Sequence, residues 1–359
     1  MKIALYSTQL FPSTPELKGY GGLELIVGLL AKYYDEHGHE VHLFAHKDSY
    51  VPKNGKLYSV DDVSARDNEK VTWRSYFAEP DAKKAFLDAD IIHDHSWGFS
   101  PYQLFEEKNG NICHTFHGTS FVRKSQSVNQ KINFITVSFN NARNQAEWND
   151  LVWRAVQNGI DISKYPFKKD KQDYLLWASR IMPVKGCHRF IDLCDKMQMK
   201  GKIFGGSIHP DPVYMSQIKK QLRNSKYVTL VGNLGEAIPF EQKVELYQNA
   251  KAVVLPVIEE ITIGKTLYQF KEPFGLIAPE ANACGTPVIV TPSGGWNETT
   301  IHGKTGFFAN SDDDFMYYIK RLDEIKPKDC RKHAEWFSYE RMAQEYLSLY
   351  REINQGRCW

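Results

Sequence analysis

Two glutamates separated by seven residues, Glu272 and Glu280, are the most informative chemical feature of the sequence. Pro279 and the residues that follow it up to Gly285 predict a short helix, with Glu280 near its N-terminus. Unpaired backbone N–H groups and the helix dipole favour an anionic ligand at such an end. Carboxylates also accept hydrogen bonds from sugar hydroxyls. The pair therefore indicates a site for an anionic ligand with hydroxyl groups, and the alternative is a surface helix with two solvated glutamates.

Basic residues suited to a diphosphate follow a predicted strand over residues 174–178. Open parallel sheets bind ligands at the carboxyl ends of their strands, where Arg180 and Lys185 are expected. Arg, Lys and helix N-termini neutralise phosphate charge. Gly21 and Gly22 follow the first predicted strand and offer backbone N–H groups, but the Gly-x-Gly-x-x-Gly pattern of dinucleotide enzymes is absent. Two solvated basic residues in a loop are the alternative interpretation of Arg180 and Lys185.

Histidines near the ends of two predicted strands form a third group. His117 follows the predicted strand 112–116 and precedes Gly118, which places its imidazole at the ligand-binding edge of a sheet. The alternative is a structural histidine. His93 and His95 alternate along another predicted strand and suggest half of a metal site. No third ligand is identifiable by spacing, so we interpret these two as structural.

Strand-like apolar runs alternate with helix-like segments along the chain, a pattern typical of parallel α/β layers. A chain of 359 residues exceeds a single core, so two domains are expected. The turn-rich, charged stretch 158–171 predicts a hinge between them. Residues 258–271 are predicted to form a mobile loop near the ligand, and residues 337–353 a final helix. The predicted strands cover residues 2–7, 40–45, 90–93, 112–116, 134–137, 153–157, 174–178, 202–204, 227–231, 252–256 and 288–291, and the first helix covers 22–37.

Composition restricts the class of protein. A formal charge of +2 gives no global reason for a polyanionic partner, so nucleic acid is not expected. No run of residues is long and apolar enough to span a bilayer, and the first residues do not resemble a signal peptide, so a cytoplasmic protein is expected. The six cysteines form no Cys-x-x-Cys pair. We therefore predict neither disulfides nor structural zinc.

The segment 272–288 resembles the signature of retaining glycosyltransferases of family four, which include glycogen synthase-like and mannosyltransferase-like group 1 transferases. The resemblance extends over nearly the whole chain. It implies the GT-B architecture, in which two Rossmann-like domains face a deep inter-domain cleft. The acceptor-side domain would comprise residues 1–163 together with a C-terminal helix over 338–359, and the nucleotide-sugar domain residues 164–337. The other matching motifs are Tyr20-Gly21-Gly22-Leu23-Glu24, Thr115-Phe116-His117-Gly118-Thr119, Asn158-Gly159-Ile160-Asp161, Ser179-Arg180-Ile181-Met182-Pro183-Val184-Lys185-Gly186 and Gly294-Gly295-Trp296-Asn297-Glu298.

The resemblance implies a retaining, metal-independent hexosyltransferase without a cofactor. The donor would be a nucleoside diphosphate sugar, most often a UDP sugar in related proteins. By resemblance, Glu280 would bind the ribose hydroxyls, Glu272 the donor-sugar hydroxyls, and His117 the transferred sugar or its phosphate. The implied catalytic residues are His117, Arg180, Lys185 and Glu272, and the implied donor-binding residues are Gly21, Gly22, Arg180, Lys185, Asn233, Leu234, Glu272, Phe274, Gly275, Leu276 and Glu280.

Other functions share this architecture, because a fold does not fix a reaction. The alternatives are a sugar-nucleotide epimerase, a sugar phosphorylase and a catalytically silent sugar-nucleotide-binding protein. The expected acceptor is a hydroxyl group of a glycan, a glycolipid or another glycoconjugate, including lipid-linked acceptors. Basic residues within 121–131 are suited to an anionic lipid headgroup, a polysaccharide or a nucleic acid, with a solvated loop as the alternative. Peripheral contact with the cytoplasmic membrane face is compatible with this pattern.

Overall fold

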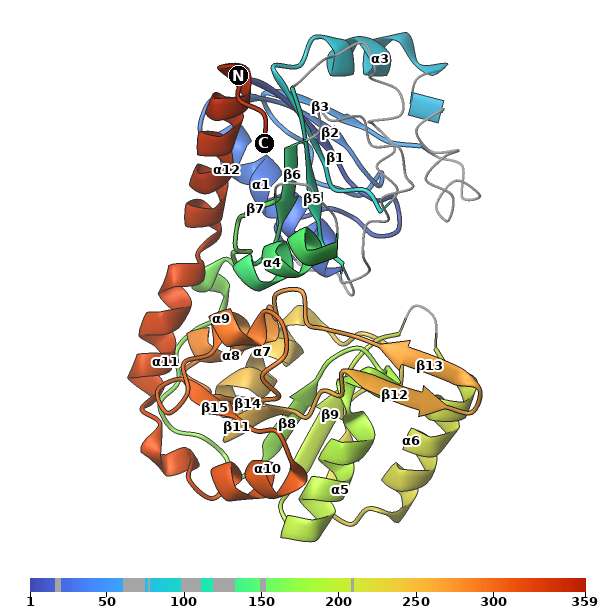
Figure 1. The fold of residues 1–359 in the computed structure, drawn as a ribbon, viewed down its shortest axis with the longest axis vertical. Helices are drawn as coiled ribbons and strands as arrows, with labels where there is room; N and C mark the ends of the chain where they lie inside the picture. Colours follow the sequence, from blue (N-terminus) through green and yellow to red (C-terminus); the bar gives the residue numbers. More distant parts are fainter. Residues whose placement is uncertain are drawn as a thin grey trace. The chain divides into compact units, whose positions relative to one another are not determined.

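The chain forms two compact units (Figure 1). Unit 1 combines Met1–Asp161 with Ser338–Trp359, and unit 2 comprises Ile162–Phe337. The boundary predicted from the sequence, between residues 163 and 164, lies close to this division. The computed structural model describes residues 1–16, 21–60, 75–76, 78–97, 111–118, 133–148, 153–207 and 210–359.

Unit 1 is built on a parallel sheet whose described strands have the order β3-β2-β1-β4-β5-β6-β7. Its central strands β4 and β5 are buried along their whole length, as expected for a parallel sheet covered on both faces. The strands are β1 (Lys2–Tyr6), β2 (Glu40–Phe44), β3 (Gly55–Tyr58), β4 (Ile91–Asp94), β5 (Ile112–Phe116), β6 (Asn133–Thr136) and β7 (Trp153–Ala155), and the described helices are α1 (Gly22–Glu36), α3 (Pro80–Leu87), α4 (Phe139–Trp148) and α12 (Tyr339–Asn354).

Unit 2 is built on a second parallel sheet, with the strand order β10-β9-β8-β11-β14-β15. Its strands are β8 (Leu175–Ala178), β9 (Gly201–Phe204), β10 (Val228–Leu230), β11 (Ala252–Leu255), β14 (Val288–Val290) and β15 (Gly306–Phe308). The helices are α5 (Cys187–Met197), α6 (Pro212–Asn224), α7 (Phe240–Asn249), α8 (Ile277–Ala283), α9 (Trp296–Thr299), α10 (Asp312–Ile319) and α11 (Pro327–Ala334), with short 3₁₀ helices η3 (Ile162–Lys164), η4 (Pro183–Lys185), η5 (Leu322–Glu324) and η6 (Glu335–Phe337).

Both sheets reverse their strand order at one point. The reversal lies between β1 and β4 in unit 1 and between β8 and β11 in unit 2. Ligands of open α/β sheets bind outside the carboxyl ends of the strands at such a point. The loops after these four strands are therefore the positions where the fold favours a site.

The C-terminal helix completes the core of unit 1. Figure 1 shows α12 lying along α1, and the two helices are in contact. Tyr346 and Tyr350 of α12 are fully buried, as is Tyr34 of α1. Because three large aromatic side chains lose their contact with water, α12 contributes a substantial share of the hydrophobic stabilisation of unit 1.

Residues 258–271 were predicted to form a mobile loop, and this prediction is wrong. They contain an antiparallel hairpin of β12 (Glu260–Ile263) and β13 (Thr266–Gln269). Strand β12 alternates polar and apolar residues. Gly264 has a φ of +60° at the first position of the two-residue turn, as a type II′ hairpin turn requires. Strands β3 and β15 were also not anticipated.

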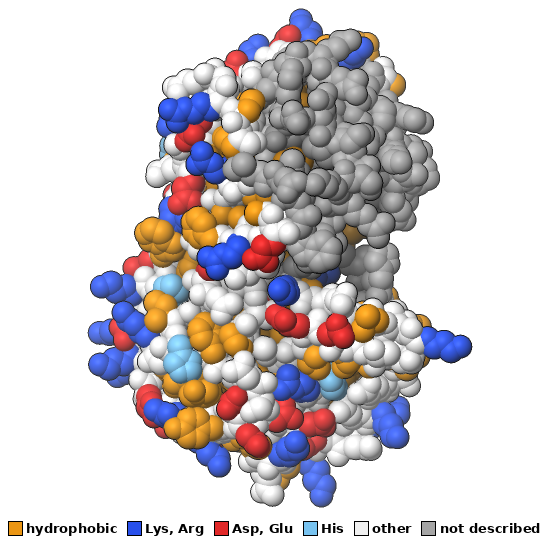
Figure 2. Space-filling model, viewed as in Figure 1, with side chains coloured by type: hydrophobic (Ala, Val, Ile, Leu, Met, Phe, Trp, Pro, Cys, Tyr) orange, Lys and Arg blue, Asp and Glu red, His pale blue; other side chains and the backbone are white. Residues whose placement is uncertain are grey.

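The surface agrees with the small net charge. Over the coloured part of the face in Figure 2, lysines and arginines are interspersed with acidic side chains. Among the described residues, no helix is both long enough and apolar enough to cross a membrane. All six cysteines are free, and five of them are buried.

Candidate active site

A buried ion pair lies at the carboxyl edge of the unit 2 sheet. Lys185 of η4 follows β8, and its Nζ donates to Glu272 Oε2 at 2.7 Å. The two side chains are only 7% and 12% exposed. The same Nζ lies 3.7 Å from the centre of the Phe270 ring, which continues from the hairpin. Burial lowers the pKa of Lys185 to about 8, although the charge of Glu272 raises it. Keeping Lys185 charged in the folded protein therefore costs free energy.

Arg180 adds a second cation beside this pair. It follows β8 directly, and its side chain is exposed. Desolvation lowers the pKa of its guanidinium, while the charge of Glu272 raises it. Arginine stays protonated throughout the physiological range. Among the described residues no hydrogen-bond acceptor binds the Arg180 side chain, so its donors are available to an anion.

Glu280 has a different environment from Glu272. It lies in α8, is 2% exposed, and its Oε1 accepts hydrogen bonds from Tyr165 at 2.9 Å and from Lys243 at 2.7 Å. Tyr247 donates to Oε2 at 3.1 Å. A carboxylate offers about four acceptor positions, so the protein already uses most of this group. We call Glu280 with Tyr165, Lys243 and Tyr247 the Glu280 cluster.

Close backbone packing fixes the segment that carries Glu272. Gly275 has a φ of +89°, and an added Cβ would lie 2.4 Å from the Trp296 ring. A Cβ on Gly295 would lie 2.4 Å from Phe274 Cα, and the Gly295 amide donates to the Glu272 carbonyl at 2.7 Å. Glycine is required at both positions. The loop after β14 therefore holds the backbone of the segment that contains Glu272.

The remaining predicted residues of unit 2 occupy neighbouring positions. Leu276 is the N-cap residue of α8. Asn233 and Leu234 follow β10, and the Asn233 side chain is exposed and donates to Glu236 at 2.9 Å. Their loop is joined to the loop after β9, because the Ser207 amide donates to the Gly235 carbonyl at 2.9 Å. The strand order thus places the predicted donor-binding residues of unit 2 at one edge of the sheet.

In unit 1, Gly21 and Gly22 mark the start of α1, with Gly21 as N-cap at a φ of +133°. An added Cβ on Gly21 would lie 2.5 Å from Glu24 Oε2, so a carboxyl group already lies against this turn. Glu24 is buried and accepts a hydrogen bond from Thr8. Burial raises the pKa of Glu24, against the lowering effect of Thr8. A phosphate at this helix start would lie close to the Glu24 carboxyl group, whose charged form is disfavoured by burial.

His117 lies just after β5 at the carboxyl edge of the unit 1 sheet and is partly exposed. Its Nε2 lies 2.8 Å from Nδ1 of His95, which is fully buried. Burial, with a further contribution from His114, lowers the pKa of His117 to about 3. The side chain is therefore a neutral imidazole at physiological pH. Over the described ranges no group of three or more His, Cys, Asp and Glu side chains is arranged to hold a metal ion.

Sequence reasoning missed several residues of this edge. Tyr165, Lys243 and Tyr247 hold Glu280, and Phe270 covers Lys185. Lys243 and Tyr247 are four residues apart on α7 and so share one helix face. The spacing predicts that the two side chains lie on the same face of α7. No neighbouring residue indicates that this face meets a carboxylate in another helix.

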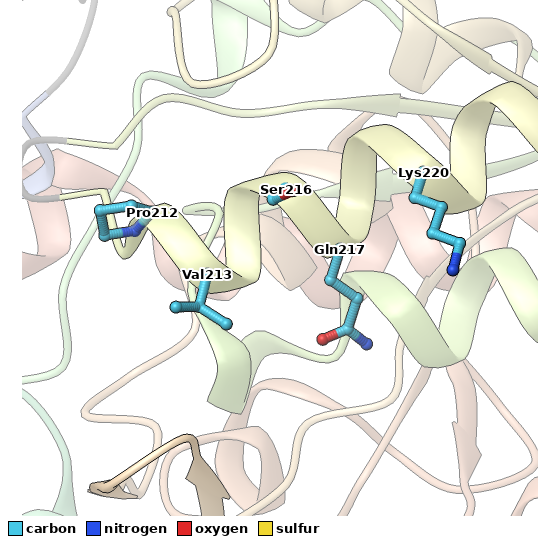
Figure 3. A pocket seen from close by; sticks show the side chains of 5 residues that line it. All are labelled: Pro212, Val213, Ser216, Gln217 and Lys220. Carbon is cyan, nitrogen blue, oxygen red and sulfur yellow. The ribbon is translucent and has the colours of Figure 1, made fainter.

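A shallow hollow on unit 2 lies away from these groups. Figure 3 shows its lining side chains, all of which project from α6. It contains none of the residues predicted for the site. Its lining residues are Pro212, Val213, Ser216, Gln217 and Lys220.

Two family models match the chain one after the other. The model described as Glycosyltransferase Family 4 matches residues 20–164, and the model described as Glycosyl transferases group 1 matches residues 160–337. The chain belongs to the family 4 glycosyltransferases of the GT-B fold. The two matches correspond closely to the first part of unit 1 and to unit 2.

Individual relatives of this glycosyltransferase are distant. It is 23% identical to YtcC of Bacillus subtilis, over 98% of this chain and 92% of that protein. Among solved structures, a sucrose-phosphate synthase from Thermosynechococcus elongatus has a TM-score of 0.77 at 20% identity and matches over 99% of both chains. Anabaena Alr3699/HepE, solved with UDP and glucose, has a TM-score of 0.69 at 16% identity, over 97% of this chain and 99% of that one. These structures share the fold.

Proposed function

We propose that this glycosyltransferase takes a sugar from a nucleoside diphosphate sugar, with UDP as the favoured nucleotide, and transfers it to a hydroxyl acceptor with retention of anomeric configuration. No metal is needed in this proposal, because protein cations neutralise the diphosphate. The acceptor class is a glycan, a glycolipid or another glycoconjugate. The solved complexes of Alr3699/HepE with UDP and with UDP-glucose support the choice of nucleotide by analogy of fold.

One observation carries the proposal. Lys185 is a buried cation with a single carboxylate partner, and Arg180 beside it has donors available to an anion. Both follow β8, at the strand-order reversal of unit 2. A diphosphate would find there two positive charges and one negative charge. Lys185 and Glu272 are buried, and electrostatic attraction is stronger in a poorly hydrated environment than in water.

The proposed reaction breaks the bond between the anomeric carbon and the β-phosphate oxygen. Negative charge grows on the departing phosphate, and Arg180 and Lys185 stabilise that charge. The acceptor hydroxyl forms its new bond on the face that the phosphate leaves, and its proton passes to a phosphate oxygen. Glu272 is placed to accept hydrogen bonds from the donor sugar, and we assign the ribose to the remaining acceptor capacity of Glu280.

The test uses the purified protein with UDP, GDP and ADP sugars. We expect Arg180→Ala to lower kcat by about 10²- to 10³-fold, the loss typical of one transition-state charge contact. Arg223→Ala is the matched control, because Arg223 is an exposed residue of α6, and we expect it to stay within about twofold of wild type. Glu272→Ala is expected to behave like Arg180→Ala. Undiminished transfer or hydrolysis by Arg180→Ala and Glu272→Ala would show that the site is assigned wrongly.

Product analysis separates the alternative reactions. A transferase gives a glycosylated acceptor and free nucleoside diphosphate. An epimerase converts the donor without an acceptor, and a phosphorylase requires inorganic phosphate. Tight binding of a donor by calorimetry without turnover over a broad acceptor panel would instead support a silent binding protein.

The acceptor side is tested separately. We propose a glycan or lipid-linked acceptor, with peripheral membrane contact through the basic residues within 121–131, which lie outside the described residues. Co-sedimentation with vesicles of anionic and of neutral lipid, at low and high salt, measures this contact. Binding that requires anionic lipid and is lost at high salt is expected, and equal sedimentation with neutral vesicles would contradict it.

A further inference from the structure

A chain of histidines in contact with one another runs inward from His117. Its Nε2 contacts Nδ1 of His95 at 2.8 Å, and Nε2 of His95 contacts Nδ1 of His93 at 3.3 Å. His93 and His95 are fully buried. The proposed function does not use either of these two residues. We call His93, His95 and His117 the histidine relay.

The inner end of the relay meets the C-terminal helix. Tyr350 of α12 contacts His93 Nδ1 at 2.5 Å, and Tyr34 of α1 donates to the Tyr350 oxygen at 3.2 Å. On the other side of the ring, His93 Nε2 lies 2.7 Å from Thr115 Oγ1. Helix α12 therefore contacts the buried His93 imidazole, and α1 is joined to this contact through Tyr350.

All three imidazoles of the relay are neutral. Burial lowers the pKa of His93 and of His95 well below 6.5, with smaller contributions from the neighbouring histidines. The other titratable groups beside the relay are His114, whose Nδ1 lies 2.8 Å from an Asp94 oxygen, and Tyr346 of α12, which hydrogen-bonds to Thr115. A neutral imidazole has one N–H and one acceptor nitrogen. Each contact in the relay therefore constrains the next one.

The direction of the hydrogen bonds follows from the tyrosines. Tyr34 donates its proton to Tyr350, which leaves the Tyr350 proton for His93. The 2.5 Å separation fits a hydroxyl donor and is shorter than the usual range of N–H donors. Nδ1 of His93 is therefore the acceptor, and its Nε2–H donates to Thr115. Tyr350 occupies the single lone pair of His93 Nδ1, so the 3.3 Å contact with His95 Nε2, between rings whose centres are 3.9 Å apart, is an electrostatic contact. It favours the His95 tautomer that places a proton at Nε2, because the other tautomer places a second lone pair there. Nδ1 of His95 then accepts from Nε2–H of His117.

We propose that α12, acting through Tyr350 and the histidine relay, holds His117 in the tautomer protonated at Nε2, so that its Nδ1 is a fixed acceptor for a substrate hydroxyl. His93, His95 and Tyr350 are positioning residues, because they act through His117. Among the described residues Nδ1 of His117 has no hydrogen-bond partner. The part that concerns a substrate rests on the proposed function, and the tautomer itself does not.

The tautomer is measured directly by nitrogen NMR of protein labelled with ¹⁵N in the histidine rings, without any ligand. The His117 signals are assigned by their loss in His117→Asn. We expect a protonated Nε2 and an unprotonated Nδ1 at pH 7, unchanged down to pH 5. A His117 ring protonated at Nδ1, or a charged ring at pH 7, would overturn the proposal.

Variants test the role of the relay. Tyr350→Phe removes the hydroxyl and keeps the ring, and we expect mixed His117 tautomers and a kcat about two- to tenfold lower, the range set by one hydrogen bond. Tyr339→Phe is the matched control in the same helix, outside the relay, and should keep both the spectrum and kcat. An unchanged His117 spectrum in Tyr350→Phe would contradict the coupling to α12.

A pair of substitutions at His95 separates positioning from packing. His95→Asn keeps an acceptor oxygen near the position of Nδ1, whereas His95→Leu has none. We expect kcat within about threefold of wild type for His95→Asn and at least about tenfold lower for His95→Leu. Equal kcat values for the two variants, at equal thermal stability, would refute the positioning role. Calorimetry should give the same affinity for UDP in the two His95 variants. If the wild-type protein binds no nucleotide, the proposed function is wrong, and the nitrogen NMR spectrum still tests the His117 tautomer.

Discussion

The charge state of Lys185 gives a quantitative prediction for nucleotide binding. Burial lowers its pKa to about 8 from the ordinary lysine value, although Glu272 opposes the change. The cation is therefore present below about pH 8 and lost above it. Because the phosphates of UDP are already ionised above pH 7, the affinity for UDP should fall as the pH rises through this range. From the ionised fractions, binding should be about tenfold weaker at pH 9 than at pH 7.

Calorimetry over pH 7 to 9.5 measures this dependence in wild type and in Lys185→Met. The variant should bind UDP weakly and without the break near pH 8. Lys251→Met is the matched control, because Lys251 is 31% exposed and has only a distant partner, Asp173 at 3.9 Å, and its curve should follow that of wild type. A flat curve for wild type, or the same break in Lys185→Met, would refute the assignment of this cation to the diphosphate.

The same group affects stability with a definite sign. Between about pH 8 and pH 10.5 the unfolded chain keeps the lysine proton and the folded chain has lost it. The free energy of unfolding should therefore rise with pH over this window through this group. At neutral pH the folded protein instead bears the cost of a buried cation. Nucleotide binding offsets that cost, which is a physical reason to keep a lysine in so buried a position.

Two further predictions concern stability. Glu280→Leu leaves the Lys243 ammonium without its carboxylate partner, so urea denaturation should show a loss of about 3 to 5 kcal/mol; a loss below 1 kcal/mol would contradict the inferred strength of the pair. Gly275→Ala forces a Cβ to within 2.4 Å of Trp296 at a φ of +89°, and should cost more than about 2 kcal/mol. Gly264→Ala, where φ is +60° and nothing lies within 4 Å, should cost only about 1 kcal/mol, and equal losses at the two glycines would refute the steric argument.

Local sequence rules were sufficient for the segment around the two glutamates. The helix was expected to include Glu280 and to end at Gly285, and α8 spans Ile277–Ala283 with Gly285 at a φ of +80°. Proline in a first turn and glycine after a last turn are signals that depend only on neighbouring residues. The alternation of strands and helices was predictable for the same reason, and most predicted strands agree with the structure to within one or two residues.

The hairpin of residues 258–271 is difficult to predict from the sequence because its two strands are short. Its strands are four residues each and largely exposed. Such short runs carry a weak hydrophobic signal, since packing against the body of unit 2 supplies their stability. The local feature that indicates the hairpin is Gly264 after the alternating residues of β12, because glycine at the first position is typical of a two-residue turn.

Contacts between distant parts of the chain were beyond reach from spacing alone. Tyr165 is 115 residues from Glu280, and Tyr350 is 257 residues from His93. A hydroxyl group has no periodicity that would reveal its partner, and burial of the partner depends on the whole fold. His93 and His95 were interpreted as structural, and the relay shows that buried histidines can connect to a residue predicted to be functional.

The two glutamates of the motif are chemically identical but differ in their protein partners. Glu280 is held by three protein donors in a buried cluster, so its position is fixed before any ligand arrives. Glu272 has one hydrogen-bonded charged partner, Lys185, so a bound diphosphate would attract that ammonium and weaken its hold on Glu272. Glu272 would therefore become available to a sugar hydroxyl when the diphosphate attracts Lys185. Binding of one end of a nucleotide sugar would in this way prepare the contact with the other end.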